Sequence, residues 1–499
     1  MYCLYFVFVV LALPYISKPC IAKAEQPHIV LIFVDDLGWN DVEWHNPDIK
    51  MPVLSKLAAD GVIFNQSYTH PTCTPSRAAM MTGMYPFRTG NQHQMIFNLH
   101  PSGVPLEFKL LPEKLKEVGY FTHMVGKWHL GFCKEEYLPT SRGFDSHYGL
   151  WTLGVGHYDK MNGVLSPSEG YDFRDNIGVV PKSDEYLTLM LAERAEHIIN
   201  GHYNKHPLFL QFTMDIPAKH LEIPDTFEAL YCDIEDERTR KFYGKLSLMD
   251  HVIGRVVDAL KAREMWDDTV LMFIGDNGAL ASQAGSNYPF RGIAGTLFEG
   301  ATRVPSLIHG SMLRETGYVN NELWNLVDLH RTILALAGAE SGSMCELDGM
   351  NMWDTFSKGK KSPREEHVYN IDDDPISPGA AIRIGDYKLI TGHPDLLYPY
   401  RDISLTDGWY NYGDPPASGL PSTDQEANAP PPLNVEYLFN VVVDPSEKNN
   451  IADQHPDIVQ NLRDRLDEHR KLLIPPVNQT TELAGDAANY CGVWSPGWC

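Results

Sequence analysis

Three short stretches of the chain are almost continuously apolar, and each ends in acidic or amide side chains. They cover residues 28–34, 208–214 and 269–274, and they are followed by Asp35-Asp36, Asp215 and Asp276-Asn277 respectively. Apolar runs of this length are typical of strands that are buried on both faces of a parallel sheet. The pattern therefore predicts three core strands with oxygen-bearing side chains at their carboxyl ends.

Helical periodicity fills the chain between these runs. Apolar residues recur three or four positions apart over residues 112–118, 184–199 and 241–262. Strands that alternate with helices predict a doubly wound α/β core. In such folds, sites form where the strands end at their carboxyl side, so the acidic strand ends mark the expected functional site.

The pattern changes after residue 363, and we expect a smaller α+β C-terminal domain over residues 364–499. Residues 380–391 predict a hairpin with its turn at Gly385-Asp386, and residues 436–443 and 455–473 predict a strand and a helix. The Pro-, Gly- and Asp-rich residues 395–433 between them predict a long surface loop. The larger α/β domain would then cover residues 25–363.

Composition indicates a folded globular protein with a strongly acidic surface. Of 499 residues, 43% are hydrophobic and 21% charged, and the formal net charge is −24. A surface of this sign repels phosphate backbones, so nucleic acid is not an expected partner, and long polyanions are disfavoured. Twenty histidines would weaken this repulsion in an acidic compartment.

The N-terminus predicts entry into the secretory pathway. Residues 4–13 are apolar and too short to span a bilayer, and Ala-Lys-Ala at 22–24 resembles a cleavage site, so residues 1–24 are interpreted as a signal peptide. A signal anchor is the alternative, because no basic segment precedes the apolar run. No later stretch is apolar enough to span a membrane. Glycosylation sequons at Asn65 and Asn478 fit a glycoprotein that is secreted or lysosomal.

Six of the eight cysteines remain after removal of the signal peptide. If Cys73 has a chemical role, five are left for disulfides, and an odd number leaves at least one free or bridging another chain. Cys491 and Cys499 are the expected local pair. The six are Cys73, Cys133, Cys232, Cys345, Cys491 and Cys499.

Hard oxygen ligands follow two of the predicted strands. Asp35, Asp36, Asp276 and Asn277 suit Ca²⁺ or Mg²⁺, and no Cys/His cluster with zinc spacing is present. For each pair alone, a turn or helix-cap carboxylate is the favoured interpretation. Two such pairs after buried strands favour a metal site.

Cys73 precedes a predicted helix. Pro75 is placed like the first helical residue, which puts Cys73 at the helix N-terminus, where free N–H groups favour an anion. Arg77, one turn on, can add a bidentate contact to a tetrahedral oxyanion. A buried or disulfide-bonded cysteine is the structural alternative.

Several motifs of the chain resemble those of the sulfatase family. The sequences CTPSR at 73–77 and TGMYPFRTG at 82–90 resemble the first sulfatase signature, and GKWHLG at 126–131 resembles the second. The segments at 32–39, 275–278 and 438–447 are similar to the family's metal-binding and C-terminal segments. The resemblance covers about residues 26–475, is closest to arylsulfatase B-type members at 122–131 and 142–145, and implies a mixed sheet of alkaline-phosphatase type.

The resemblance implies a modified cysteine and a bound cation. Cys73 would be oxidised to formylglycine by the formylglycine-generating enzyme, and its hydrate would offer one hydroxyl to attack sulfur and a second that permits release of sulfate. Ca²⁺ would be bound by the modified Cys73 and by Asp35, Asp36, Asp276 and Asn277. The implied reaction is hydrolysis of a sulfate ester.

Three further residues receive roles from the same resemblance. Arg77 would hold the hydrate, Lys127 would neutralise sulfate charge, and His129 would hydrogen-bond the hydrate. Solvated side chains are the alternative interpretation of Lys127 and His129. A phosphatase on a related core is a further alternative, but it would use Ser or Thr and zinc.

The pattern departs from the family at two positions. Ala294 stands where the family usually has Lys, and Ala218 stands where it has a sulfate-contacting His, with His220 two residues on. One interpretation is an active sulfatase on an ester with a good leaving group, such as the N–O-linked sulfate of a glucosinolate, or one in which His220 acts as the acid. The other is a catalytically weakened, sulfatase-like binding protein.

Overall fold

The computed structural model describes residues 26–93, 95–164, 166–217, 220–280, 284–339, 347–375, 378–395 and 436–499. The predicted signal peptide, Ala218, Cys345 and most of the predicted loop at 395–433 lie outside the described residues. No helix in the described part of the chain has the length and apolarity that crossing a membrane requires.

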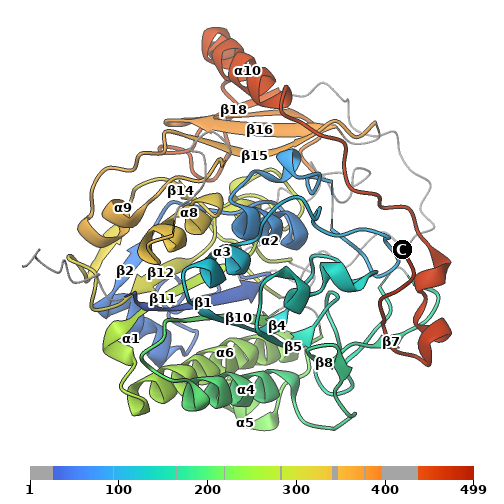
Figure 1. The fold of residues 1–499 in the computed structure, drawn as a ribbon. Helices are drawn as coiled ribbons and strands as arrows, with labels where there is room; N and C mark the ends of the chain where they lie inside the picture. The colour runs from blue at the N-terminus through green and yellow to red at the C-terminus, as the bar shows by residue number, and fades with distance from the viewer. Residues whose placement is uncertain are drawn as a thin grey trace, which may run out of the picture.

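A ten-stranded mixed sheet forms the centre of the molecule, as expected (Figure 1). Its order is β13-β2-β12-β11-β1-β10-β4-β5-β8-β9, with β11, β1, β10, β4 and β5 parallel and β12 antiparallel to β11. The strands are β1 (His28–Asp35), β2 (Val62–Phe64), β4 (Phe121–Lys127), β5 (Ser146–Leu150), β8 (Arg174–Asp175), β9 (Gly178–Val179), β10 (Leu208–Pro217), β11 (Thr269–Gly275), β12 (Ser306–His309) and β13 (Tyr318–Asn320).

Helices cover both faces of this sheet. In Figure 1, α1, α4, α5 and α6 lie on one face, and α2, α3 and α8 lie on the other. The helices of the described residues are α1 (Pro52–Asp60), α2 (Cys73–Thr82), α3 (Leu111–Glu117), α4 (Leu187–Gly201), α5 (Asp225–Glu228), α6 (Glu237–Ala262), α7 (Glu299–Thr302), α8 (Val327–Leu336), α9 (Trp353–Lys358) and α10 (Pro456–Arg470).

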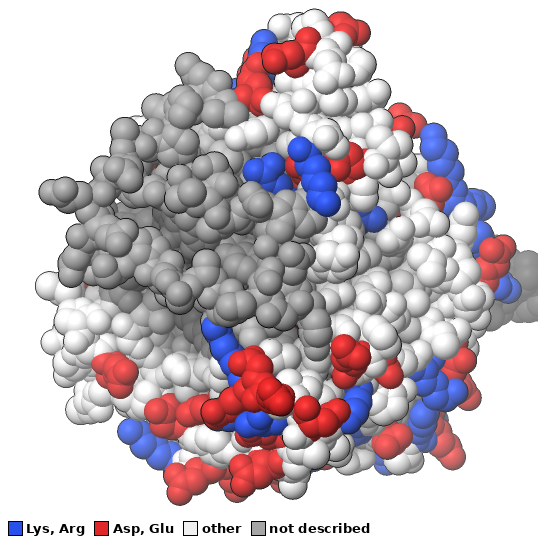
Figure 2. Space-filling view, turned by 180° about the vertical axis from the view of Figure 1, so that it is seen from behind, with Lys and Arg blue, Asp and Glu red and all other residues white. Residues whose placement is uncertain are grey.

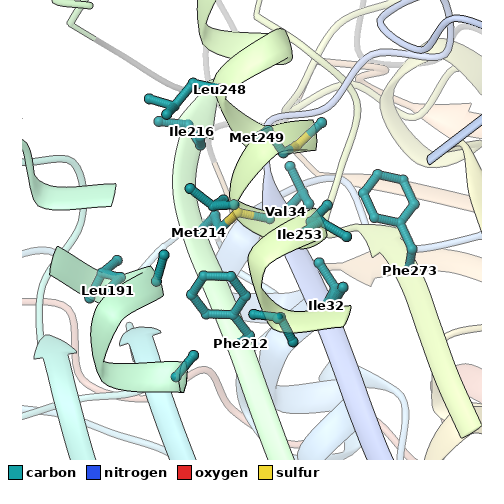
Figure 3. Close-up of a cluster of buried hydrophobic side chains, with 14 of the residues drawn as sticks. Ile32, Val34, Leu191, Phe212, Met214, Ile216, Leu248, Met249, Ile253 and Phe273 are labelled. Atoms are coloured by element: carbon teal, nitrogen blue, oxygen red, sulfur yellow. The ribbon is translucent and has the colours of Figure 1, made fainter. Parts of the chain in front are cut away.

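The unbroken apolar sequence of β1 follows from this double coverage. Ile32 and Val34 pack against α6, where Figure 3 shows them near Met249 and Ile253. The alternate residues, such as Phe33, belong to the core on the opposite face, with α2 and α8. Since successive side chains of a strand point to opposite faces, a strand covered on both sides has no position left for a polar residue.

Element boundaries differ from the predictions where local hydrogen bonds decide them. The helix predicted from residue 241 begins at Glu237, because the Asp236 side chain accepts a hydrogen bond from the Thr239 amide as an N-cap. The strand predicted to end at Met214 continues to Pro217 along its neighbour β1.

A second, antiparallel sheet with helix α10 lies beside the first sheet. Its order is β15-β16-β17-β18, and β16 and β17 form the predicted hairpin. The boundary at residue 364, just before this sheet, stays a prediction. The remaining strands are β3 (Ser67–Tyr68), β6 (Met161–Asn162), β7 (Gly170–Tyr171), β14 (Trp324–Asn325), β15 (Glu366–Asp372), β16 (Gly379–Ile384), β17 (Tyr387–Gly392) and β18 (Glu436–Asn440).

The last residues of the chain, 474–499, return to the large domain and are called the C-terminal strap. In Figure 1 the strap descends from α10 along the side of the molecule to β7. Its backbone amides at Ile474 and Val477 donate to the carbonyls of Phe87 and Gly90, at 3.0 and 2.8 Å. Trp494 is fully buried, and its indole N–H donates to the Asn162 carbonyl.

The strap ends in a disulfide between Cys133 and Cys499, with a Cα–Cα distance of 5.5 Å. The expected Cys491–Cys499 pair is therefore wrong. Cys491 is exposed and free in a left-handed turn, and the chain then carries Cys499 to Cys133, whose carbonyl accepts from two strap amides. The expectation of at least one free cysteine is confirmed by Cys232 and Cys491.

Removal of this disulfide should weaken the whole fold, because it closes a loop of 366 residues. We expect Cys499→Ser to lower the free energy of unfolding by about 2–5 kcal/mol, measured by denaturant unfolding under non-reducing conditions. Cys491→Ser is the matched control, since Cys491 is exposed and free. Equal unfolding midpoints for the two variants would contradict this pairing.

Candidate active site

Three acidic strand ends meet at one edge of the sheet, as the sequence predicts. Val34 is paired with Gly275 in the parallel register of β1 and β11, so Asp35 and Asp276 follow side by side. Ligand atoms of Asp35, Asp36, Cys73 and Asp276 all lie within 4.8 Å of one another, and all four residues are buried. This cluster unites residues that are up to about 240 positions apart in the chain.

Asp36 and Asn277 are held in place by their neighbours in the cluster. The Asp36 amide donates to Asp276 Oδ1 at 3.1 Å, and Asn277 Nδ2 donates to Asp36 Oδ1 at 2.7 Å. Asp36 has a left-handed backbone with φ 53°, which turns its side chain back towards the cluster. Among the described residues, the buried Asn277 Oδ1 has no hydrogen-bond partner.

The cluster fits a hard divalent cation. Burial and the neighbouring Asp35 carboxylate raise the pKa of Asp276. Burial also opposes ionisation of Asp35, but Lys127 and Arg77 hold the pKa of that carboxyl below its usual range. A cation would remove the remaining repulsion, and carboxylate and amide oxygens, including Asn277 Oδ1, are ligands that Ca²⁺ and Mg²⁺ prefer.

Arg77 connects the ends of three strands. Its Nη2 donates to Asp276 Oδ2 at 2.8 Å and to Asp35 Oδ1 at 3.1 Å, and its Nη1 donates to the Lys127 carbonyl at 2.9 Å. The guanidinium is buried. These contacts make Arg77 a support for the two carboxylates, and its predicted contact with a hydrated aldehyde stays a prediction.

Cys73 is the first residue of α2, which begins two residues earlier than the position of Pro75 suggests. Its Sγ lies 3.9 Å from Asp36 Oδ1 and 4.0 Å from Lys127 Nζ. Burial, together with Asp276 and Asp35, raises the pKa of the Cys73 thiol well above its usual value. An unmodified thiol would therefore remain protonated and be a weak nucleophile.

Lys127 lies between the carboxylates of two neighbouring strands. Its Nζ donates to both Asp35 oxygens at 2.7 Å and lies 3.6 Å from Asp215 Oδ1. Burial would lower the pKa of this ammonium, but Asp35 raises it above the ordinary value, so the group is charged. Asp215 follows from the strand-end pattern, although no separate role was predicted for it.

His129 lies on a loop beside the start of α2 and has a left-handed backbone at φ 57°. Its Nε2 lies 3.0 Å from the Ile96 carbonyl oxygen, and since a carbonyl only accepts, Nε2 carries the proton. Thr74, the residue after Cys73, donates its hydroxyl to the His129 carbonyl at 3.2 Å. The loop and the start of α2 are therefore joined directly.

His220 and Ala294 concern the two sulfate contacts that the family pattern has and this sequence lacks. The His220 side chain is exposed, and its backbone carbonyl accepts a hydrogen bond from buried Lys245, so its role as an acid stays a prediction. Ala294 is buried, and the next amide, of Gly295, donates to the Pro71 carbonyl at 2.7 Å, two residues before Cys73. Position 294 thus lies in the segment beside the cluster and carries no cation.

Comparison with known proteins identifies the family of this chain. A family model described as Sulfatase matches residues 27–339. Arylsulfatase J of Mus musculus is 34% identical over 500 residues, covering 95% of this chain and 81% of the relative. The chain belongs to the sulfatase family. As a sulfatase, it is a sulfuric-ester hydrolase.

Further relatives and solved structures are similar to this chain over most of its length. N-acetylgalactosamine-6-sulfatase of Mus musculus is 29% identical and covers 95% of this chain and 91% of its own. Among solved structures, Ps i-CgsB is 26% identical with a TM-score of 0.76, covering 94% of this chain and 96% of that chain. PsFucS1 sulfatase from Pseudoalteromonas sp. shares the fold at 21% identity, with a TM-score of 0.71 and coverage of 91% and 92%.

The position of Lys127 depends on the glycine before it. A Cβ on Gly126 would lie 1.6 Å from the Thr213 carbonyl oxygen of β10, and its φ is 110°. We expect Gly126→Ala to separate β4 from β10 and to prevent stable folding, measured by thermal unfolding. Gly119→Ala is the control, because Gly119 has a φ of 95° with nothing within 4 Å of an added Cβ, and it should lose only about 1–2 kcal/mol from backbone strain. Similar losses of stability in the two variants would show that the strained φ, and not the close approach of Thr213, causes the effect.

Proposed function

We propose that this sulfatase hydrolyses a small or sugar sulfate ester with formylglycine at position 73 and Ca²⁺ at the carboxylate cluster. The observation that supports it most strongly is the placement of Cys73 Sγ between Asp36 and Lys127. Position 73 thus lies beside both a proposed cation ligand and a buried ammonium group, where an aldehyde hydrate would supply a hydroxyl nucleophile.

The residues of this chain have distinct tasks in the proposed reaction. Bound Ca²⁺ would polarise a sulfate oxygen and favour the ionised nucleophile. Lys127 would face the sulfate charge from the β4 side, while Arg77 keeps Asp35 and Asp276 in position as ligands. His129, with its proton on Nε2, presents Nδ1 as an acceptor, which suits it to receive a hydrogen bond from position 73.

The net charge of the chain and the absence of a lysine at position 294 support the proposed substrate class. Without a lysine at Ala294, the pocket has one sulfate-facing cation less than the family pattern, which favours an ester with a good leaving group such as an N–O-linked sulfate of glucosinolate type. Lys and Arg side chains lie among Asp and Glu on the face shown in Figure 2, and the net charge is −24, which disfavours long polyanions. Relatives named for N-acetylgalactosamine 6-sulfate support a sugar sulfate as the other option.

The location we propose is the secretory pathway, with the mature protein secreted or lysosomal. Maturation by the formylglycine-generating enzyme belongs to that route. The disulfide between Cys133 and Cys499 fits an oxidising compartment.

The modification of Cys73 can be tested directly. Peptide mass spectrometry of the protein from its native tissue should show an aldehyde at position 73, and Cys73→Ala should lower turnover of p-nitrophenyl sulfate by more than about 10³-fold. Cys491→Ala, an exposed cysteine far along the chain, should keep full activity. An unmodified thiol in active protein would refute the proposed nucleophile.

The cation can be tested by binding as well as by rate. We expect calorimetric titration to detect Ca²⁺ binding that Asp36→Asn weakens by about tenfold or more, with chelation abolishing turnover. Asp48→Asn is the control, because Asp48 is an exposed acidic residue outside the cluster. Equal Ca²⁺ affinities for the two variants would remove the cluster as the cation site.

A second candidate is a weakened sulfatase that retains ligand binding, and the absence of a lysine at Ala294 favours it. It predicts an aldehyde or thiol at position 73 with Ca²⁺ bound and no turnover of any sulfate ester tested. The experiments above therefore separate it from the active enzyme.

A further inference from the structure

Thr74 is a buried polar side chain of the active centre that the proposed reaction does not use. It follows Cys73 in the first turn of α2, and only 1% of its surface is exposed. A buried hydroxyl needs hydrogen-bond partners, because an unpartnered polar group in the interior is unfavourable. The partners of Thr74 therefore indicate what its hydroxyl does.

These partners lie outside the helix that contains Thr74. A threonine inside a helix can donate to the carbonyl four residues earlier, as Thr82 of α2 does to Ala78 at 2.7 Å. Thr74 instead donates to the His129 carbonyl at 3.2 Å and accepts from the Ile96 amide at 3.1 Å. Ile96 and His129 both lie outside helices and strands, so one hydroxyl supplies partners to two irregular segments.

A third hydrogen bond closes a ring among the same residues. His129 Nε2 donates to the Ile96 carbonyl at 3.0 Å, since a carbonyl can only accept. Within this ring, Thr74, Ile96 and His129 each donate one hydrogen bond and accept one, and all three are buried. When one ring nitrogen of a neutral histidine carries the proton, the other is an acceptor. The three hydrogen bonds therefore determine which nitrogen of His129 is protonated.

We propose that Thr74 is a positioning residue that, through the Ile96 carbonyl, keeps the proton of His129 on Nε2 and so leaves Nδ1 to accept a hydrogen bond from position 73. This inference rests on the proposed function of the same site. The Ile96 amide is held by the Thr74 hydroxyl, and the carbonyl of the same residue holds the imidazole. Without the hydroxyl, Ile96 loses this support, and His129 can take the other tautomer.

Removal of the hydroxyl without a change in side-chain size tests this role. We compare wild type, Thr74→Val, and Thr74→Ser, which keeps the hydroxyl. Thr269→Val is the matched control, because Thr269 is also buried and donates to the Met265 carbonyl at 2.8 Å, at the amino end of β11. The readouts are kcat and KM for p-nitrophenyl sulfate, the aldehyde fraction at position 73 by mass spectrometry, the thermal unfolding midpoint, and NMR of histidine labelled at the ring nitrogens.

We expect Thr74→Val to lower kcat per aldehyde by about 10- to 100-fold, the range found when a partner that orients a histidine at a metal site is removed. KM should change little, because the contacts of Lys127 with Asp35 remain. Thr74→Ser should restore kcat, and Thr269→Val should match wild type. In the His129→Ala background, Thr74→Val should have little further effect on kcat.

A purely structural role of Thr74 gives a different result. Thr74→Val would then lower the unfolding midpoint and leave kcat per aldehyde unchanged, or it would lower kcat equally with and without His129. Either result would overturn the inference. If Thr74→Val does not fold, Thr74→Ala removes the same hydroxyl with a smaller side chain and replaces it in every comparison.

The NMR measurement separates this inference from the proposed function. The signals of His129, assigned by their loss in His129→Ala, should show the proton on Nε2 in wild type and Thr74→Ser, and a mixture of tautomers in Thr74→Val. Turnover by wild type with an unchanged His129 tautomer in Thr74→Val overturns the role of Thr74 alone. Absence of turnover overturns the enzymatic proposal, and the tautomer in Thr74→Val then still supports or refutes the role of Thr74.

Discussion

The active centre depends on the balance between crowded carboxylates and two buried cations. Two carboxylate charges about 5 Å apart repel each other by roughly 3 kcal/mol at an effective dielectric constant of about 20. Arg77 reduces this repulsion by contacting both Asp35 and Asp276, and Lys127 contacts Asp35 from the other side. Because these contacts join β1, β11 and β4, the same interactions that make a cation site also fix the relative positions of the strand ends.

A second network of buried ion pairs connects the C-terminal sheet with a segment next to the carboxylate cluster. Lys388 Nζ contacts Glu299 Oε1 at 3.1 Å and Glu447 Oε1 at 2.8 Å, and all three side chains are fully buried. Glu299 begins α7, and the carbonyl of Ala301 in the same helix accepts from the Gly278 amide at 2.7 Å, directly after the cluster. The small sheet is therefore connected to the active centre through buried ion pairs and helix α7.

The sequence predicts the central strands and the cluster well because both depend on local signals. Short apolar runs and the acidic residues after them are visible in the chain, and parallel pairing brings their ends together. The Cys133–Cys499 pair and the contacts of Arg77 with the carboxylates were not predictable, since they depend on distances that only the folded chain defines. Lys245 had a usable signal, a lysine in the apolar stripe of a long helix, but the His220 carbonyl that accepts its hydrogen bond lies in a different segment.

Two residues of the active centre have strained backbones that contacts with distant parts of the chain stabilise. Asp36 and His129 both have left-handed backbones, a conformation that costs non-glycine residues about 1 kcal/mol or more and persists only where the surroundings enforce it. Asn277 and Asp276 hold Asp36, while Thr74 and the Ile96 carbonyl hold His129. The segment that contains Ile96 is itself fixed by the C-terminal strap, because the Glu482 amide donates to the Leu99 carbonyl at 2.9 Å. The strap also ends at Cys133, four residues after His129, so the last residues of the chain constrain the loop of His129 from both sides and stabilise a geometry that the loop would not adopt by itself.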